Sequence, residues 1–381
     1  MKKLPIGIQS IEKILTHSEY VYVDKTSFIK KLIDQGPPHY FISRPRRFGK
    51  SLFISTLEQV FKGNRELFKE CKIYESDYDW QEYPVLTFDF AQILNNTPDN
   101  LEVALLETLQ DMALSYGVTI SGASSQSQLK RLILALSQKK QVVILVDEYD
   151  RPILNNLDEI AIAEMNCKLL KNFFGTLKGL DSHIKFTFIT GISKFSQASL
   201  FSGLNNLKEI TLDSRYAEMM GYTEEEVKTY FSKHIESVIQ YRIKLGIPAT
   251  KESILNEVRT WYNGYRFSRA ESYVYNPFST LNYMDEKEVK TYWYSFGPPS
   301  FLIDELKKYS DSMISLDGTT ATEEELMIMS FKDEIELTAL MYHTGYFTIK
   351  GFNPISKRYH LGLPNEEVKA AFPTSIKRSR S

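Results

Sequence analysis

A basic stretch that ends in glycine, lysine and serine contains the residue types that bind phosphate. Residues 44–51 read Arg-Pro-Arg-Arg-Phe-Gly-Lys-Ser. Gly49 would let the backbone approach an anion closely, Lys50 would reach the β- and γ-phosphates of a nucleotide, and the Ser51 hydroxyl would bind Mg²⁺. The usual pattern is G-x-x-x-x-G-K-[ST], and Arg44 occupies its first glycine position. Because Gly-Lys-Ser also arises by chance and often caps an ordinary helix, this stretch alone leaves both interpretations open.

A second pattern, later in the chain, adds acids of the kind that such a site needs. Five consecutive apolar residues, 142–146, are typical of a strand buried on both faces, and Asp147 and Glu148 follow them. In a P-loop ATPase the acid at this position holds Mg²⁺, directly or through water. An adjacent glutamate can act as general base for the attacking water. The alternative is a buried strand that leaves the core through charged residues, but the two patterns in this order favour a nucleotide site.

The elements that must position these residues are those of an α/β protein. Strands that alternate with helical patterns indicate a mainly parallel sheet flanked by helices, and ligands of such sheets bind at the carboxyl ends of the strands. Lys50, Asp147 and Thr190 lie at or just past expected strand ends, so the Thr190 hydroxyl is a candidate sensor of the γ-phosphate; the alternative is an ordinary strand threonine. Lys194, just beyond, is a further candidate. The expected strands are 39–43, 84–90, 141–147 and 184–190, and the expected helices are 51–61, 100–115, 126–138 and 157–178.

The flanking regions have a different character. Before the loop, Asp24 is expected to cap a helix that Gly36 ends. Past residue 220, Thr223 and Glu226 form a capping-box pattern, and helices followed by a hairpin favour a mostly helical, winged-helix-like second domain. Its expected elements are helices near 249–262, 300–310 and 322–340, loops and short strands over 261–283, and a hairpin over 345–362. We therefore expect an N-terminal segment packing on the core (1–38), a P-loop ATPase domain (39–220), the second domain (221–372) and a frayed basic tail (373–381).

Composition excludes several other classes. The chain has 381 residues, 43% hydrophobic and 25% charged, with a net charge of −2, so no global basic field argues for nucleic acid. Cys71 and Cys167 are far apart and form no CxxC pair, which argues against a disulfide framework and favours a reducing cytoplasm. The N-terminus lacks the apolar length of a signal peptide, and no run approaches the ~18 apolar residues of a membrane helix. The histidines show no metal-ligand spacing.

Several motifs in order give the chain a family resemblance. It resembles the bacterial and archaeal AAA-ATPase-like proteins, whose C-terminal part is often a PD-(D/E)xK nuclease-like domain. The resemblance runs from about residue 5 to about residue 370, and the family's own P-loop lacks the first glycine, as here. The motifs that carry it are residues 22–26, 44–51, 146–150 with Pro152, 190–195 with 204–206, 221–226, 261–265, 275–279 and 361–368.

The resemblance implies an additional-strand-type P-loop ATPase with a C-terminal lid that binds ATP and Mg²⁺ at Walker A and Walker B motifs. The nuclease-like domain would begin where this chain stops, so nuclease activity is not carried over. Asp150 and Arg151 are expected to be structural, and Arg46 and Arg47 either clamp phosphate, face solvent or pair with acids of the lid. The expected site is catalytic Lys50, Glu148 and Thr190; nucleotide-binding Arg46, Arg47, Phe48, Gly49, Lys50, Ser51 and Leu52; and metal-binding Ser51 and Asp147.

Three functions are consistent with these residues. The leading hypothesis is a Mg²⁺-dependent ATPase that acts as a nucleotide-driven switch. The alternatives are an ATP-binding regulatory or scaffold module without turnover, and a DNA-associated ATPase that has lost its nuclease-like domain. The expected partners are ATP, with DNA, a second copy of the chain or another protein as further candidates, and no membrane.

Overall fold

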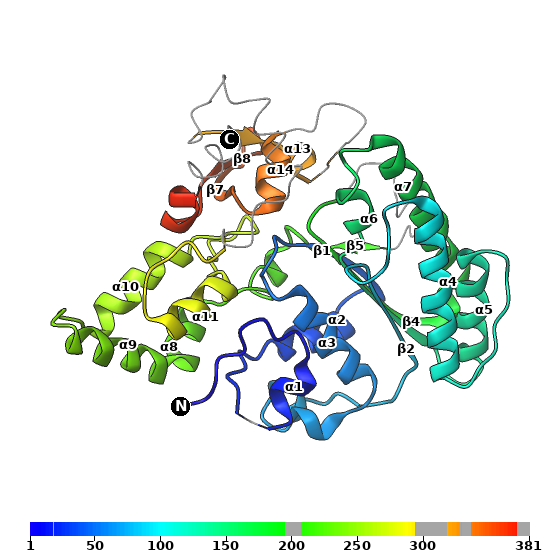
Figure 1. Cartoon of the computed structure of the whole chain (residues 1–381), viewed down its shortest axis with the longest axis horizontal. Coiled ribbons are helices and arrows are strands. Elements are labelled where there is room, and N and C mark those ends of the chain that lie inside the picture. Colours follow the sequence, from blue (N-terminus) through cyan, green and yellow to red (C-terminus); the bar gives the residue numbers. More distant parts are fainter. Residues whose placement is uncertain (18, 195–206, 294–317, 328, 330–336, 372–381) are drawn as a thin grey trace.

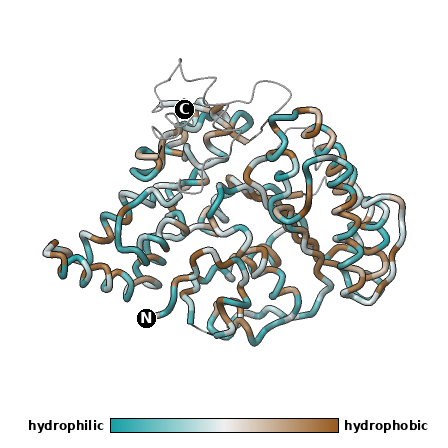
Figure 2. The backbone as a smooth tube through the Cα atoms, in the orientation of Figure 1, coloured by the Kyte–Doolittle hydropathy of each residue, from teal (hydrophilic) through white to brown (hydrophobic). Residues whose placement is uncertain are grey.

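The computed structural model describes residues 1–17, 19–194, 207–293, 318–327, 329 and 337–371. A central sheet carries helices on both of its sides, and a mostly helical C-terminal region lies against one end of it (Figure 1). Apolar residues occur along the central strands and at intervals along the helices beside them (Figure 2). The expected segments 204–206, 300–310 and 373–381 lie outside the described residues.

The central sheet has five strands, all parallel, in the order β2-β3-β4-β1-β5. Strands β1 and β3 are buried along their whole length, which explains their continuous apolar runs. Strand β4 lies between β1 and β3, so the α/β fold of the additional-strand type predicted from the sequence is confirmed. The strands are β1 (His39–Ser43), β2 (Val85–Asp89), β3 (Val142–Asp147), β4 (Ile184–Gly191) and β5 (Lys208–Glu209).

Helices α1 to α3 lie on one side of the sheet and α4, α5 and α7 on the other (Figure 1). The expected helix over 157–178 is shorter than predicted: α7 begins only at Ile160, after residues in turns, and a 3₁₀ segment starts at Thr176. The expectation that Asp24 caps α2 is wrong, because Lys25 occupies the N-cap position and no side chain caps the helix. The Asp24 carboxylate, one residue earlier, accepts hydrogen bonds from the Thr26 N–H (2.8 Å) and hydroxyl (2.7 Å). The helices are α1 (Ile11–Leu15), α2 (Thr26–Asp34), α3 (Lys50–Phe61), α4 (Pro98–Ser115), α5 (Ser125–Ser137), α6 (Arg151–Leu154) and α7 (Ile160–Gly175).

The C-terminal region combines helices with a small antiparallel sheet of order β6-β8-β7. The capping box of Thr223 and Glu226 and the hairpin near the end of the chain are both confirmed. The elements are α8 (Glu224–Tyr230), α9 (Ser232–Lys244), α10 (Lys251–Tyr262), α11 (Pro277–Glu286), β6 (Thr320–Ala321), α13 (Glu323–Met327), α14 (Leu337–Thr344), β7 (Thr348–Asn353) and β8 (Arg358–Gly362).

Two expectations for this region are wrong. Residues 261–283 are not only loops and short strands, because α11 begins at Pro277 after the Asn276 side chain accepts a hydrogen bond from the Ser279 N–H (3.1 Å). Residues 322–340 are not one helix: α13 ends at Met327, and the Met329 N–H donates outside any helix to the Lys194 carbonyl (2.9 Å). At Met329 this tertiary contact overrides the helical pattern, and residues 328 and 330–336 lie outside the described residues.

A buried acid, Glu367, joins parts of the C-terminal region. Its carboxylate accepts hydrogen bonds from the Ser279 hydroxyl and the Trp293 N–H, both at 2.9 Å. Burial raises the pKa of Glu367 to about 7, although these hydrogen bonds act to lower it. The buried neighbours Tyr262 and Tyr265 stay neutral over this range, because burial raises the pKa of each above the ordinary tyrosine value.

Glu367→Gln is expected to stabilise the protein at alkaline pH. A carboxyl group with a pKa of about 7 in the folded chain and near 4.5 in the unfolded chain binds more protons when folded between those values. The free energy of unfolding of the wild type therefore falls as pH rises through this window, by about 3 kcal/mol in all. Glutamine mimics the protonated acid, so the variant should exceed the wild type by up to about 3 kcal/mol at pH 8 and differ little below pH 5.

Urea unfolding at both pH values measures this difference. The partly exposed neighbour Glu366, which pairs with Lys369, gives the control Glu366→Gln, with no pH-dependent gain. Equal destabilisation by Glu367→Gln at both pH values would contradict the prediction.

Candidate nucleotide-binding site

The loop between β1 and α3 has the backbone geometry of a phosphate-binding loop. Gly49 adopts a left-handed conformation (φ 92°), and no heavy atom lies within 4 Å of the position that a Cβ would take. The backbone at Gly49 is therefore open to a ligand, and helix α3 begins directly after it at Lys50. The first amides of a helix have no partners within the helix and favour anions.

Lys50 is buried within this loop. Its ammonium group donates hydrogen bonds to the carbonyl oxygens of Arg44 (2.9 Å) and Pro45 (3.0 Å). Burial lowers the pKa of Lys50, and the nearby acids Glu148 and Asp147 partly oppose this effect. The loop thus holds a cation beside the acids that end β3.

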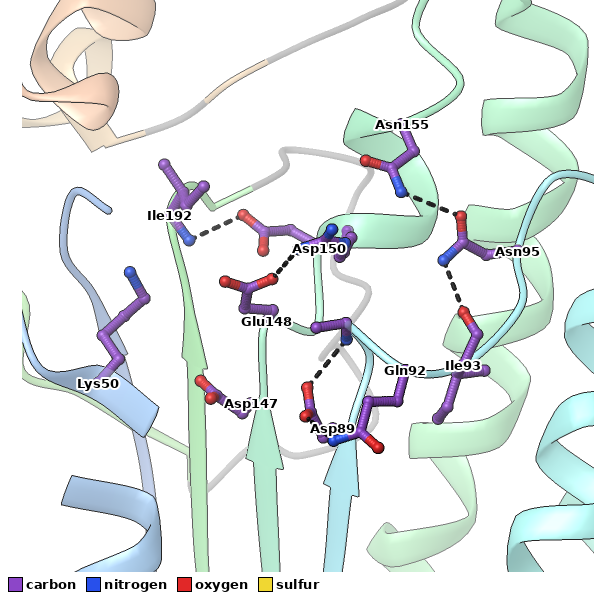
Figure 3. Close-up of polar contacts among 12 residues, drawn as sticks. Lys50, Asp89, Gln92, Ile93, Asn95, Asp147, Glu148, Asp150, Asn155 and Ile192 are labelled. Carbon is purple, nitrogen blue, oxygen red and sulfur yellow. Dashed lines mark hydrogen bonds and ion pairs between the residues drawn. The ribbon is translucent and has the colours of Figure 1, made fainter. Parts of the chain in front are cut away.

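Asp147 is fixed by hydroxyl groups from two neighbouring elements. The Thr190 hydroxyl on β4 donates to Asp147 Oδ1 at 2.5 Å, and Ser51 at the start of α3 also forms a hydrogen bond with this carboxylate. Burial raises the pKa of Asp147, while the two hydroxyl groups and Lys50 act to lower it. Figure 3 shows Lys50, Asp147 and Glu148 gathered at the carboxyl ends of β3 and β4. Because Mg²⁺ prefers oxygen ligands, the Ser51 and Asp147 oxygens fit this ion.

Glu148 lies in an unusual backbone conformation and is paired with a cation. Its φ is 51°, in the left-handed region that a residue with a long side chain seldom adopts. The Arg151 Nη1 donates to Glu148 Oε2 at 2.6 Å. Burial acts to raise the pKa of Glu148, but nearby cations outweigh it and lower this pKa below the ordinary glutamate value. Those cations are Lys50, Arg151, which acts through both its hydrogen bond and its charge, and Arg46.

Gly49, Lys50, Ser51 and Glu148 line one cavity of about 510 Å³, which is within the range of small-molecule sites. Asp147 and Thr190 are buried and are not among the residues that line it. Its charged end contains the loop residues and the acids Asp89 and Glu148. Its other end is mostly apolar and lies between the N-terminal segment and the C-terminal region. The charged end includes Arg46, Arg47, Gly49, Lys50, Ser51, Asp89, Glu148 and Arg151, and the apolar end includes Ile8, Tyr22, Val23, Met219, Met220, Tyr222, Phe278 and Leu281.

The structure therefore brings most of the expected residues together. Phe48 and Leu52 also line the cavity. Thr190 is buried, and its hydroxyl donates a hydrogen bond to Asp147. Thr190 therefore contacts an expected metal ligand. Lys194 pairs with Glu209 instead of a member of this cluster.

Three charged residues that line the cavity, Lys25, Asp89 and Arg151, were not among the expected site residues. Lys25 pairs with Glu226 at 2.6 Å. Asp89 ends β2 and lies in register with Asp147 of β3; its carboxylate accepts hydrogen bonds from the Ala91 N–H (2.9 Å) and the Gln92 side chain (2.7 Å). The sequence signal that could have identified Asp89 is its position near the end of the expected strand 84–90. Arg151 was expected to be structural but lines the cavity. Asp150, by contrast, is buried and accepts hydrogen bonds from the backbone of Ile192 (2.9 Å) and from Ser193.

Arg44, at the first glycine position of the pattern, points away from the cavity. Its buried guanidinium donates to the carbonyl oxygens of Ser43 (2.9 Å), Thr211 (2.8 Å) and Tyr216 (3.4 Å) and lies 4.3 Å from the centre of the Phe267 ring. Burial lowers the pKa of Arg44 to about 10. Because Arg44 is buried and is not among the residues that line the cavity, an arginine here does not obstruct it.

Other residues of the loop also pack against the C-terminal region. The Phe48 ring lies edge-on to Tyr265 and Phe267, with centroid distances of 4.8 and 5.3 Å. A Cβ on Gly345 would lie 2.9 Å from the Pro45 Cβ, so only glycine fits there. The phosphate-binding loop is thus enclosed between the sheet and the C-terminal region.

The strand order and the loop before α3 define the class of P-loop NTPases. The family model described as "Predicted AAA-ATPase" matches residues 5–201, and the chain belongs to this family. Family membership supports a P-loop ATPase that binds nucleotide.

Two further comparisons were found. The chain is 40% identical over 380 residues to the "Uncharacterized protein in vnfD 5'region" of Azotobacter chroococcum mcd 1, a match that covers 98% of this chain and 70% of that protein. A solved structure of the Aeropyrum pernix ORC2 protein, in ADPNP and ADP complexes, aligns over 93% of this chain and 94% of that chain with 9% identity and a TM-score of 0.34. In the described part of the chain, no helix combines the length and the apolar character needed to cross a membrane.

Proposed function

We propose that this protein binds ATP with Mg²⁺ in the cavity at the end of the sheet and hydrolyses the ATP. The observation that carries the proposal is the convergence of Lys50, Ser51, Asp147 and Glu148, from two separate sequence motifs, on one site. Gly49, Lys50 and Arg46 bind the phosphates, and the apolar end of the cavity, with Tyr22 and Phe278, holds the base.

Ser51 and Asp147 hold Mg²⁺, which neutralises charge on the phosphates when it is bound. Thr190 positions Asp147 through the hydrogen bond between them. Glu148 accepts a proton from water as the water oxygen bonds to the γ-phosphorus and the bond to the β,γ-bridging oxygen breaks. The products are ADP and inorganic phosphate. The contacts of the loop with Phe267 and Gly345 support a switch, in which nucleotide binding changes how residues 39–220 and 221–372 pack together.

Thermal unfolding with and without Mg-ATP tests the binding step. A ligand at about 100 times its Kd should add about 2.7 kcal/mol to the free energy of unfolding if it binds the folded chain alone. We expect this stabilisation in the wild type and its loss in Lys50→Ala. The matched control is Lys62→Ala, a partly exposed lysine just after the same helix that pairs with Glu58, which should respond like the wild type. No stabilisation of the wild type would contradict the proposal.

A further inference from the structure

Arg151 lies in the charged end of the cavity and not in the core. It begins the short helix α6, three residues after Glu148, and its guanidinium Nη1 is 2.6 Å from Glu148 Oε2. The exposed fractions of the two side chains are 36% for Arg151 and 22% for Glu148. Both line the same cavity as Lys50 and Arg46, so the ion pair borders the space where the phosphates are proposed to bind.

In the proposed complex with ATP, the γ-phosphoryl group is a second possible partner for Arg151. A planar guanidinium matches phosphate oxygens as well as it matches a carboxylate, with two parallel N–H donors. A γ-phosphoryl group carries more negative charge than a carboxylate and presents three oxygens. Bound beside Lys50, it would compete directly with Glu148 for Arg151. Arg151 has a long side chain and is partly exposed, so a change of rotamer can move its guanidinium away from Glu148 within the cavity.

The pairing also restricts Glu148 as a base. Arg151 donates to Glu148 Oε2, one of the two oxygens through which a carboxylate can accept a proton. Loss of this contact when ATP binds would make both oxygens available to the water that attacks the γ-phosphorus. A group that leaves Glu148 and stabilises the charge of the transferring phosphoryl group would serve both needs at once.

We propose that Arg151 is a catalytic residue that the chain supplies to its own site: it exchanges its partner Glu148 for the γ-phosphoryl oxygens of bound ATP, and this exchange frees Glu148 to accept a proton from the attacking water. The inference rests on the proposed function, because it requires ATP in this cavity. It goes further in assigning the arginine that stabilises the transition state to the same chain as Lys50. Each chain then holds a complete site.

Steady-state phosphate release by Arg151→Ala and Arg151→Lys tests the assignment. Loss of one preorganised donor to the transition state is expected to lower kcat by about 10²–10³-fold. Lysine keeps the positive charge but lacks the two parallel N–H donors of the guanidinium. The kcat of Arg151→Lys should therefore lie between those of Arg151→Ala and the wild type. The thermal stabilisation by Mg-ADP should stay at the wild-type size in both variants, because ADP has no γ-phosphate. The matched control is Arg215→Ala, whose guanidinium pairs with Asp213 and does not line the cavity, with wild-type kcat.

Mixing two variants tests whether Arg151 acts in the site of its own chain or in that of a neighbouring chain. Arg151→Ala keeps Lys50, and Lys50→Ala keeps Arg151, so a mixture of the two variants regains activity only if Arg151 acts on a neighbouring chain. We expect no regain, and a regain would overturn the assignment. Wild-type or faster turnover by Arg151→Ala, with an active wild type, would overturn this inference alone. A wild type that neither binds nor hydrolyses ATP would overturn the proposed function as well.

Discussion

Replacing Glu148 by glutamine is expected to lower the rate of ATP hydrolysis by about 10²–10⁴-fold and to leave Mg-ATP bound. Glutamine keeps the size of the side chain and can still accept the hydrogen bond that Arg151 donates, but it cannot accept a proton from water. Lys50, Ser51 and Asp147, the groups proposed to bind phosphate and Mg²⁺, are unchanged. Binding and turnover should therefore separate in this variant.

Phosphate release measures turnover, and the rise in unfolding temperature with Mg-ATP measures binding. Glu107→Gln, at an exposed position of α4, is the control and should hydrolyse ATP like the wild type. If Glu148→Gln turns over at the wild-type rate, Glu148 is not the base. If the wild type is stabilised by Mg-ATP but releases no phosphate, the module that binds ATP without turnover becomes the better description.

Arg44→Gly is expected to destabilise the protein by about 3–5 kcal/mol, although it restores the first glycine of the common P-loop pattern. The substitution removes a buried guanidinium that donates to three backbone carbonyl oxygens and packs on the Phe267 ring. Hydrogen bonds to charged groups contribute about 1.5–3 kcal/mol each, and acceptors left buried without donors add a desolvation cost. Added backbone freedom in the unfolded chain acts in the same direction.

Urea unfolding without nucleotide measures this loss. Arg47→Gly is the matched control in the same loop, because Arg47 is exposed and already has a positive φ of 70°. Glycine relieves that strain while the contact with the Phe278 ring is lost, so the two effects should nearly cancel, within about 1 kcal/mol. An unchanged urea midpoint for Arg44→Gly would show that the guanidinium contributes nothing net to stability.

The parts of the fold that depend on local pattern were predictable. The apolar runs of 39–43 and 141–147 and the helix after Gly49 are each specified by neighbouring residues. The helix that begins at Pro277 was missed, although Asn276 followed by Pro277 is itself a start signal; the aromatic residues around it favoured strands and loops instead.

The site was predictable only as far as parallel topology brings strand ends to one edge. That rule places Lys50, Asp147 and Thr190 near each other. It does not specify that Thr190 uses its hydroxyl on Asp147, since this follows from β4 pairing with β3. The interactions of Arg44 with Phe267 and of Arg151 with the cavity depend on tertiary packing, which no local pattern encodes.

The enclosure of the phosphate-binding loop has a consequence for the synthesis of the protein. A chain still on the ribosome emerges from its N-terminus, so Lys50 and the strand-end acids appear long before Phe267 and Gly345, which complete the packing of the loop. Nucleotide would then act as a late ligand that stabilises only finished chains. Nascent or prematurely ended chains would lack that protection and would stay open to chaperones and proteases, which couples possession of a working site to survival in the cell.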